Sequence, residues 1–319
     1  MEEIRYNHLN SYLKELFGER TLKICVDGNF TCPNRDGRVA RGGCIFCGLM
    51  GAGELIKYRC DEVLKSISSQ VIGFLNSYRG ERANKFIVYF QSFTNTYDTI
   101  SNLKLKYDTA LNSSNKIVGL EVATRPDCVD EDVVRLLASY KEKYYVCVEL
   151  GLQTANDKIG RGINRGYTSE DFVRAVDLLH KYDIPVVAHL MVGLPNECEE
   201  DIMDTVALIN SSHCEGIKIH STYVIKDTVL EDMYRKGEYT PISQDYYVRQ
   251  VLNIISHLNK DIIIHRINAD PPKDIFVAPD WILHKKIVIN DINRNLKELN
   301  ITQGCCLADK YKINLKRYS

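Results

Sequence analysis

The chain has 319 residues, of which 45% are hydrophobic and 26% charged, a composition typical of globular proteins that excludes a mainly disordered chain. The 41 Lys and Arg residues balance the 42 Asp and Glu residues to a formal charge of −1, so any binding of nucleic acid must rely on a local basic region. Since a domain takes roughly 100 to 200 residues, this length fits one large domain or two small ones.

The cysteine usage and the N-terminal sequence predict a reducing, cytoplasmic setting without a membrane partner. The longest apolar run, residues 184–195, contains His189 and is shorter than the roughly 18 residues of a membrane span. The first residues, Met-Glu-Glu-Ile-Arg, lack the charged and then apolar pattern of a secretory signal. We therefore expect the eleven cysteines to be thiols, and the four between Cys25 and Cys47 indicate metal binding or catalysis before disulfides.

Short, nearly continuously apolar segments predict parallel strands that are buried on both faces. They span residues 22–27, 86–91, 117–123, 145–151, 186–192 and 216–223. Stripes such as that from Val63 to Leu75 predict helices between them, and Asp130 and Thr168 occupy N-cap positions, with Asp171 placed for a capping box. Strand and helix units repeated in this way form either a barrel or an open doubly wound sheet. We favour an α/β fold with an incomplete (β/α)6 barrel.

Two regions lie outside these repeated units. A helix is predicted over residues 6–17, and a further apolar strand over residues 262–267 belongs to a C-terminal region that begins near Pro241. No linker rich in Pro, Ser or Gly separates them from the rest. We therefore expect residues 1–240 to form the barrel with its N-terminal helix, and residues 241–319 to form an α/β extension that packs on the barrel as a cover on the substrate side.

The loop after the first strand carries three cysteines, Cys32, Cys44 and Cys47. A Cys-x-x-Cys turn lets two thiolates reach one metal centre, and a third can arrive from a Gly-rich loop. Three ligands on a cube of four irons leave one iron open to bind and activate a cofactor. The alternative is a structural zinc site completed by Cys25, but Cys25 lies within an apolar run and is expected to pack like a small hydrophobic residue.

The same loop resembles that of the radical S-adenosylmethionine (SAM) superfamily, and specifically of the YtqA/YhcC-like, MnmL-type proteins. The resembling segment, residues 27–48, reads DGNFTCPNRDGRVARGGCIFCG. The resemblance continues at residues 89–91, 94–97, 123–127, 149–154, 163–166, 193–195, 219–220, 237–239, 264–266, 270–272 and 278–281, which covers nearly the whole chain. It implies a TIM-like radical SAM barrel.

The resemblance also implies the cofactors and the reaction. Cys32, Cys44 and Cys47 would hold a [4Fe-4S] cluster whose fourth iron binds the amino and carboxylate groups of SAM. One electron, from a donor such as flavodoxin or ferredoxin, would cleave SAM to methionine and a 5′-deoxyadenosyl radical that abstracts a hydrogen atom. MnmL-type proteins act on the wobble uridine of tRNA and convert its 5-carboxymethylaminomethyl group to 5-aminomethyl, often on 2-thiouridine. A partner methyltransferase that completes the modification is one option.

Three polar residues are candidates for contact with SAM because related residues do so in similar enzymes. Gln91 ends the second strand, where the superfamily places groups that receive the SAM amino group, although a polar residue can also simply cap a strand end. Gln153 and Arg165 are similar to a Gln and an Arg that contact SAM in oxygen-independent coproporphyrinogen oxidases, and a guanidinium group suits a carboxylate.

Thr124, Arg125 and Glu149 complete the predicted cofactor contacts because they lie at or near the ends of the third and fourth strands. Glu121 and Glu149 lie in apolar strands, so each needs a partner or a position at the barrel mouth. For Glu121 a structural ion pair is the alternative. His189 stands where related enzymes have an acidic residue that contacts the ribose hydroxyl groups of SAM. For His189 this contact is open, and the alternative is a histidine that packs in the core.

The C-terminal region carries His265, Arg266, Asp270 and Trp281, which predict either substrate recognition or an interface that closes the barrel. Residues 281–319 hold eight Lys and Arg against three Asp and Glu, so this tail could meet an RNA backbone or simply be solvated. The sequence thus predicts a radical SAM enzyme that modifies tRNA. The alternatives are a radical SAM enzyme for a small molecule or peptide, and a zinc-stabilised binding module without catalysis.

Overall fold

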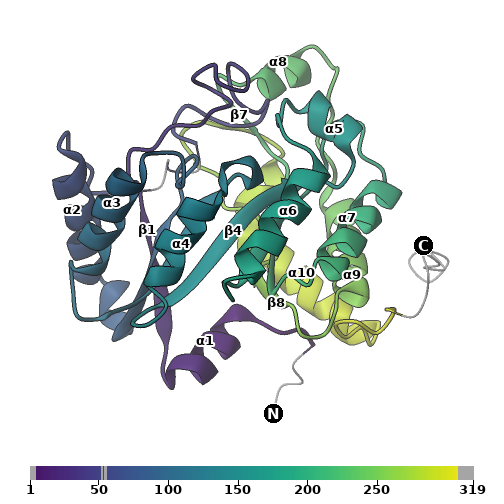
Figure 1. Cartoon of the computed structure of the whole chain (residues 1–319). Coiled ribbons are helices and arrows are strands. Elements are labelled where there is room, and N and C mark those ends of the chain that lie inside the picture. Colours follow the sequence, from purple (N-terminus) through teal and green to yellow (C-terminus); the bar gives the residue numbers. More distant parts are fainter. Residues whose placement is uncertain (1–4, 52, 54–55, 308–319) are drawn as a thin grey trace.

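The computed structural model describes residues 5–51, 53 and 56–307, in which seven parallel strands form one strongly curved sheet (Figure 1). Neighbouring strands pair in the order β1-β2-β3-β4-β5-β6-β8. Their bounds are β1 (Thr21–Val26), β2 (Lys85–Phe90), β3 (Ile117–Thr124), β4 (Tyr145–Gln153), β5 (Val186–Val192), β6 (Gly216–Ser221) and β8 (Ile263–Arg266). An open doubly wound sheet would reverse its strand order in the middle. The sequential order therefore confirms the incomplete barrel.

Helices surround this sheet (Figure 1). They are α1 (Leu9–Phe17), α2 (Val63–Leu75), α3 (Ile100–Leu111), α4 (Glu131–Ser139), α5 (Asp157–Gly162), α6 (Ser169–His180), α7 (Glu199–Ser211), α8 (Val229–Arg235), α9 (Gln244–His257) and α10 (Lys285–Glu298), with short 3₁₀ turns at Gly80–Arg82, Pro126–Cys128 and Asp280–His284. Most of the helices cover the convex side of the sheet, whereas α1 packs against the two edge strands, and α5 and α8 lie at the carboxyl ends of the strands. The core lies between these helices and the strands, where alternate strand residues such as Ile24 and Val26 are fully buried. The opposite face of each strand is thereby directed into the barrel.

The strands and caps agree closely with the sequence-based predictions. All six predicted strands exist, with ends that differ from the prediction by at most two residues, and β4 continues beyond its predicted end to Gln153. Asp130 accepts a hydrogen bond from the backbone N–H of Val133, and Thr168 and Asp171 form a capping box at the start of α6. The local sequence patterns predict these strands and caps correctly because each pattern agrees with the packing around it.

The gap between the two edge strands, β1 and β8, is narrowed by the N-terminal helix. His8 forms a bridge with Ile264, and α1 then packs against both edge strands (Figure 1). The predicted C-terminal strand, residues 262–267, corresponds to β8, which pairs with β6 and so joins the main sheet. The division at residue 240 into a barrel and a covering extension stays a prediction.

A second, smaller core at the carboxyl ends of the strands had no signal in the sequence. The short strands β7 (Val224–Ile225) and β9 (Phe276–Ala278) pair antiparallel there. Ile45 from the cysteine loop packs in this core with residues of α5 and α8, such as Ile159 and Leu230. The cysteine loop therefore rests on an apolar support of its own.

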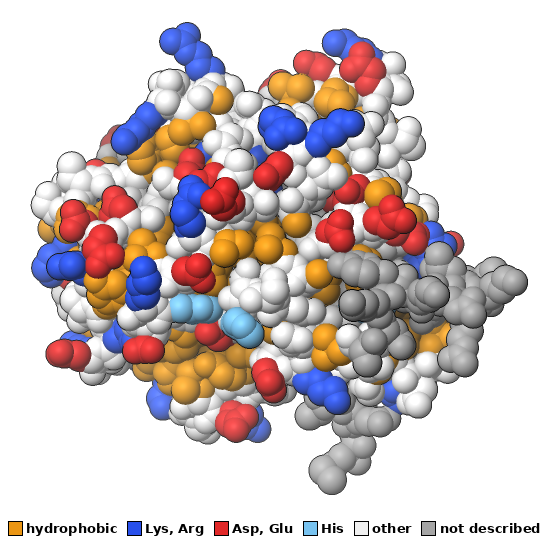
Figure 2. All heavy atoms as spheres, turned by 45° about the vertical axis from the view of Figure 1, so that its right-hand side comes forward, with side chains coloured by type: hydrophobic (Ala, Val, Ile, Leu, Met, Phe, Trp, Pro, Cys, Tyr) orange, Lys and Arg blue, Asp and Glu red, His pale blue; other side chains and the backbone are white. Residues whose placement is uncertain are grey.

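The surface reflects the balanced composition. On the face seen in Figure 2, acidic and basic side chains are interspersed and separated by hydrophobic and neutral groups. Within the described part of the chain, no helix combines the length and the apolar character needed to cross a bilayer.

The close approach of His265 to β6 makes Gly216 a sensitive position. A Cβ atom at Gly216 would lie 2.9 Å from His265 Nε2 and 2.9 Å from Val187 Cγ2, so Gly216→Ala must push the ring or the strand aside. We expect the free energy of unfolding of the cofactor-free protein to fall by about 1–3 kcal/mol, measured by urea unfolding. Gly162→Ala is the control, since no atom lies within 4 Å of its added Cβ. Equal urea midpoints for Gly216→Ala and Gly162→Ala would contradict the close contact between His265 and β6.

Candidate active site

The three cysteines of the predicted cluster lie in one loop at the carboxyl end of β1, the end at which barrel enzymes carry their active sites. The side chains of Cys32, Cys44 and Cys47 are each half-buried. The turn between Cys44 and Cys47 is closed by a backbone hydrogen bond of 3.0 Å. Arg35 donates to the carbonyl oxygens of Cys47 and Gly48 at 2.7 and 2.6 Å, which fixes the far end of the turn.

The segment Ile163–Arg165 is docked against this loop through the main chain. Ile45 donates its backbone N–H to the carbonyl of Ile163 at 3.1 Å. The Asn164 side chain donates to Gly43 O at 2.7 Å, and the Asn34 side chain donates in return to Asn164 O at 2.5 Å. Asn34 Nδ2 also lies 3.7 Å from Cys44 Sγ, so an N–H group is directed at a predicted cluster ligand. The resembling motif at residues 163–166 thus supports the loop that carries the cysteines.

Arg165 is fully buried, and its guanidinium group is satisfied within the protein. It donates to the carbonyls of Leu152, Thr154 and Tyr167 at 2.7, 2.6 and 3.0 Å and forms an ion pair with Asp157 at 2.7 Å. These contacts tie the segment that supports the cysteine loop to the end of β4. Arg165 therefore has a positioning role in this structure, whatever further contact it makes with a cofactor.

Arg125 and Thr124 also lie near the segment 163–165 that supports the cysteine loop. Arg125 donates to Arg165 O at 2.9 Å and forms a two-pronged ion pair with Asp127 at 2.9 and 2.7 Å. The hydroxyl groups of Thr124 and Thr96 are 2.6 Å apart. The structure thus joins Arg125 and Arg165 directly, which the sequence could not show.

Gln91 and Gln153 lie at the carboxyl ends of β2 and β4. The backbone N–H of Gln91 donates to Val26 O at 3.2 Å, so Gln91 stands next to the start of the cysteine loop. Gln153 accepts a hydrogen bond from the Tyr167 hydroxyl at 2.7 Å and has a positive φ of 61°. Such a backbone is rare outside glycine and re-aims a side chain, as functional sites often require.

The three loop cysteines do not have the close spacing of ligands to one zinc ion. Thiolates on a single tetrahedral zinc, with bonds of about 2.3 Å, lie roughly 3.8 Å apart. Among the described residues, the three cysteine sulfurs do not gather within 4.8 Å of one another, whereas Glu121, Glu149 and His265 do. Burial and the nearby thiols of Cys47 and Cys32 raise the pKa of the Cys44 thiol to about 12. Three thiols in one loop are the donor set of an iron cube that keeps one corner open.

Cys25 corrects one prediction. Its side chain is exposed and does not pack as a small hydrophobic residue. The reason is strand alternation, since Ile24 and Val26 fill the outer core and leave Cys25 directed into the open interior of the barrel. Although the thiol of Cys25 is accessible, its enclosure by the barrel walls raises its pKa, and the nearby charges of Lys218, Arg266 and Lys23 oppose this shift.

A buried ionic network fills the barrel interior below the cysteine loop, and each of the seven strands contributes one residue. The members are Lys23 (β1), Tyr89 (β2), Glu121 (β3), Glu149 (β4), His189 (β5), Lys218 (β6) and His265 (β8). Glu149 is its centre, with hydrogen bonds from Tyr89 at 2.5 Å and His189 at 2.7 Å and a close ion pair with Lys218. Glu121 pairs with Lys23 at 2.6 Å. Both buried carboxylates thus have the partners that their burial demands.

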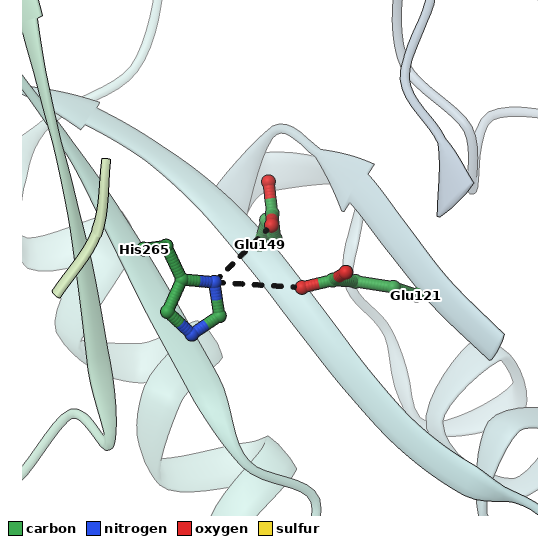
Figure 3. Close-up of side chains that lie close together, drawn as sticks. All are labelled: Glu121, Glu149 and His265. Carbon is green, nitrogen blue, oxygen red and sulfur yellow. Dashed lines mark ion pairs between the residues drawn. The ribbon is translucent and has the colours of Figure 1, made fainter. Parts of the chain in front are cut away.

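Lys23 closes the network across the barrel. Its Nζ atom also lies 3.3 Å from Glu149 and 3.2 Å from His265 Nδ1, so the first and last strands meet through this ammonium group. Figure 3 shows the Glu121 and Glu149 carboxylates directed at the His265 ring, each 3.8 Å from it. These three side chains have the spacing of a cation site, but the ammonium of Lys23 already supplies the positive charge there.

The charges of the network follow from its burial. Burial alone would raise the pKa of Glu149, but Lys218 and Lys23 hold it well below its ordinary value. Burial raises the pKa of Glu121 to about 8, although Lys23 opposes the shift. Burial also lowers the pKa of His189 and lowers that of His265 to about 3. Near neutral pH, His189 and His265 are therefore uncharged, and the carboxylate of Glu149 is ionised.

Two of the four predicted substrate residues lie in or beside this network. His265 is a member, and Arg266 follows it on β8. Asp270 instead pairs with Lys285 at 2.8 Å, and the Trp281 indole donates to Ile242 O at 2.9 Å. The described contacts of Asp270 and Trp281 therefore lie within the C-terminal part and do not join the network.

The sequence analysis had no role for Lys23, Tyr89 or Lys218. A signal was present, because Lys23 and Lys218 stand between apolar neighbours in predicted strands, at positions that alternation directs away from the outer core. Glu121 and Glu149 were recognised by this reasoning, and pairing the acids with the bases of other strands would have found the lysines.

Comparison with known families identifies the fold and its cofactors. Residues 37–209 match the Radical SAM superfamily, and residues 214–298 match the Radical_SAM C-terminal domain. The chain belongs to the radical SAM superfamily. It is accordingly a radical SAM enzyme with a [4Fe-4S] cluster and SAM as cofactors.

The chain is similar along its whole length to uncharacterised proteins. It is 37% identical to YtqA of Bacillus subtilis, covering 95% of this chain and 92% of that protein, and 34% identical to YhcC of Escherichia coli K12, covering 95% of each. These similarities confirm the predicted YtqA/YhcC-like relationship.

More distant similarities cover part of the chain or the fold alone. The tRNA uridine(34) acetyltransferase of Dehalococcoides mccartyi is 29% identical over 52% of this chain and 36% of its own length. The structure of Methanocaldococcus infernus Elp3 superposes with a TM-score of 0.64 at 19% identity, covering 90% of this chain and 65% of that chain. The second similarity supports the incomplete barrel.

The cysteine assignment predicts a clear difference between loop and strand positions. Cys32→Ala, Cys44→Ala or Cys47→Ala should each lower the iron and sulfide bound after anaerobic reconstitution and abolish 5′-deoxyadenosine formation with SAM and dithionite, because each removes a cluster ligand. Cys25→Ala should retain the cluster, since Cys25 lies on β1 and not in the loop. One bound zinc per chain, lost in all four variants, would contradict the assignment.

Arg165 offers a test of positioning against direct contact. Arg165→Met leaves three buried carbonyls and Asp157 without their donor, so the free energy of unfolding should fall by about 3–5 kcal/mol in urea unfolding of the cofactor-free protein. Arg135→Met, which removes an exposed pair with Glu131, is the control and should change it by less than about 0.5 kcal/mol. Unchanged stability together with lost SAM binding would contradict the positioning role.

Proposed function

We propose that this radical SAM enzyme acts on the wobble uridine of tRNA and converts its 5-carboxymethylaminomethyl group, on uridine or 2-thiouridine, to 5-aminomethyl. The single observation behind the chemistry is the cysteine loop, which lies at the mouth of a barrel whose interior is polar and ionic. The substrate class is supported by the resemblance to MnmL-type proteins and by the partial similarity to a tRNA uridine(34) acetyltransferase.

When bound, the cluster and SAM supply a 5′-deoxyadenosyl radical that removes a hydrogen atom from the substrate. In the proposed reaction, this atom comes from the methylene group of the glycyl unit. The resulting carbon radical would return one electron to the cluster, and water admitted after the radical is gone would hydrolyse the imine so formed to the 5-aminomethyl group and glyoxylate. The part of the protein is to hold both reactants close together and to exclude water from the barrel mouth.

Within the proposed site, the predicted cofactor residues divide into two groups. Gln91 and Gln153 stand at strand ends beside the cysteine loop and are assigned to contact with SAM. Thr124, Arg125, Glu149 and Arg165 are engaged in buried contacts and are assigned to holding the loop and the barrel interior in place. His265 and Arg266 are assigned to the substrate, and Asp270 and Trp281 to fixing the residue 241–319 cover over it.

The same proposal includes an electron donor, a partner enzyme and a location in the cell. A flavodoxin or ferredoxin would supply the electron, and a methyltransferase acting on the 5-aminomethyl product stays a prediction. No disulfide joins any of the eleven cysteines, all of which lie in the described residues, and we therefore assign the enzyme to the cytoplasm. The basic residues beyond 307, which the sequence offers for RNA contact, lie outside the described residues.

The proposal predicts a specific change in tRNA. In a deletion strain, mass spectrometry of tRNA nucleosides should show 5-carboxymethylaminomethyl derivatives accumulating at the wobble position, with the 5-aminomethyl derivatives depleted. Restoring the wild-type gene should reverse the change, whereas restoring a Cys44→Ala gene should not, because that variant lacks a cluster ligand.

Unchanged wobble uridines in the deletion strain would remove the tRNA assignment. If the purified holoenzyme then formed 5′-deoxyadenosine in the presence of a small molecule or peptide but not of tRNA, the alternative substrate class would take its place. Salt dependence of binding separates the two, since contacts with tRNA phosphates weaken steeply as salt rises.

A further inference from the structure

A bulge in β8 brings two consecutive side chains to the interior of the barrel. Along β6 and β8, Ile217 pairs with Ile264, and the next pair joins Lys218 to Arg266, so His265 and Arg266 together oppose one residue. In a bulge of this kind the extra residue breaks the alternation of the strand. His265 contacts the interior network, and Arg266, opposite the inward-directed Lys218, shares that face.

The positive charge of Arg266 acts on the pKa values of groups on the inner face of the barrel. Burial raises the pKa of Cys25 and lowers that of His220, and the positive charges of Lys218 and Arg266 act on both groups. Cys25 lies on β1 and His220 on β6. The Arg266 guanidinium is therefore near the interior, beside the network and on the same side as the exposed thiol of Cys25.

Arg266 differs from the lysines of the network because it has no counter-ion. Lys23 and Lys218 each contact a buried carboxylate. Among the described residues, the Arg266 guanidinium forms neither an ion pair within 4.0 Å nor a side-chain hydrogen bond. A half-buried guanidinium without a carboxylate is uncommon, since burial of a charge is costly unless the charge is paired.

His220 supplies a second group without a partner. Its Nε2 atom is buried and has no hydrogen-bond partner, and its ring lies 5.2 Å from the ring of His189. A buried polar atom that lacks a partner is rare in native proteins and indicates a missing ligand or water. His220 is two residues beyond Lys218 on β6, so both side chains lie on the same face of the strand.

The network cannot neutralise this region by itself. Glu149 is shared between Lys218 and Lys23, and Glu121 is engaged by Lys23. The interior therefore holds more positive charge than its two carboxylates balance, and the excess is at Arg266. A planar guanidinium group matches a carboxylate with two parallel hydrogen bonds, and a neutral His220 can donate a third from Nε2.

We propose that Arg266, with His220 and Lys218 beside it, forms a subsite in the barrel interior that binds the carboxylate of the substrate. This inference rests on the proposed function, because the glycyl unit that is to be removed ends in a carboxylate. The subsite selects tRNA that still carries the unit over tRNA that has lost it, and it places the methylene next to the carboxylate at a fixed point in the barrel.

The test compares two tRNAs on the reconstituted holoenzyme, one with the 5-carboxymethylaminomethyl group and one with the 5-aminomethyl group. Wild-type protein should bind the first at least about 10-fold more tightly, and Arg266→Gln should remove most of that preference, as loss of one partner of a buried charged pair does. Arg266→Lys should restore part of it, and His220→Phe should reduce it. Arg135→Gln, on the outside of α4, is the matched control and should keep the full preference.

Three results would overturn the subsite. Arg266→Gln could keep the full preference, which would show that the guanidinium does not contact the carboxylate. The variant could instead weaken the affinity for SAM as strongly as that for tRNA, which would assign the subsite to the carboxylate of SAM. Wild-type protein could also bind both tRNAs equally although it converts the first.

Failure of the proposed function gives a different result. If wild-type protein converts neither tRNA, the tRNA assignment falls, and the subsite is then tested with glycine and N-methylglycine as probes in calorimetric titrations. Binding to wild-type protein that is lost in Arg266→Gln and regained in part in Arg266→Lys would keep the subsite. Absence of binding to wild-type protein would overturn it.

Discussion

The central constraint of this structure is the burial of the Glu149 carboxylate inside the barrel. A buried charge is tolerated only when it is paired and hydrogen-bonded, and Glu149 meets this condition through Tyr89, His189, Lys218 and Lys23, which come from four other strands. Through Lys23 the network also takes in Glu121 and His265, so it touches every strand of the sheet. Strand order, curvature and the closeness of the two edges must all be right for these groups to meet.

The fold could be predicted largely from local patterns. Apolar runs gave the strands, helical stripes gave the covering helices, and the capping residues at α4 and α6 are where their short polar side chains placed them. The cysteine loop was also evident, because a Cys-x-x-Cys turn with a third cysteine in a Gly-rich loop is a strong chemical signal. These features depend on residues close together in the chain.

Features that depend on distant residues were beyond the sequence. Cys25 was expected in the outer core, but the direction of its side chain follows from which face of β1 meets the helices. Arg165 was expected to contact SAM, and only the fold shows that three backbone carbonyls and Asp157 surround its guanidinium group. The bulge that places Arg266 beside Lys218 depends on the register between β6 and β8, which no short segment determines.

The support beneath the cysteine loop has a consequence for the assembly of the metal centre. Ile45 donates to Ile163 and accepts from the backbone of Leu230, while Asn34 of the loop donates to Asn164 O and the Asn164 side chain donates to Gly43 O. The loop is thus held by the polypeptide's own hydrogen bonds and by its small apolar core. Loading of the cofactor then requires less ordering of the chain than it would in a loop without these contacts.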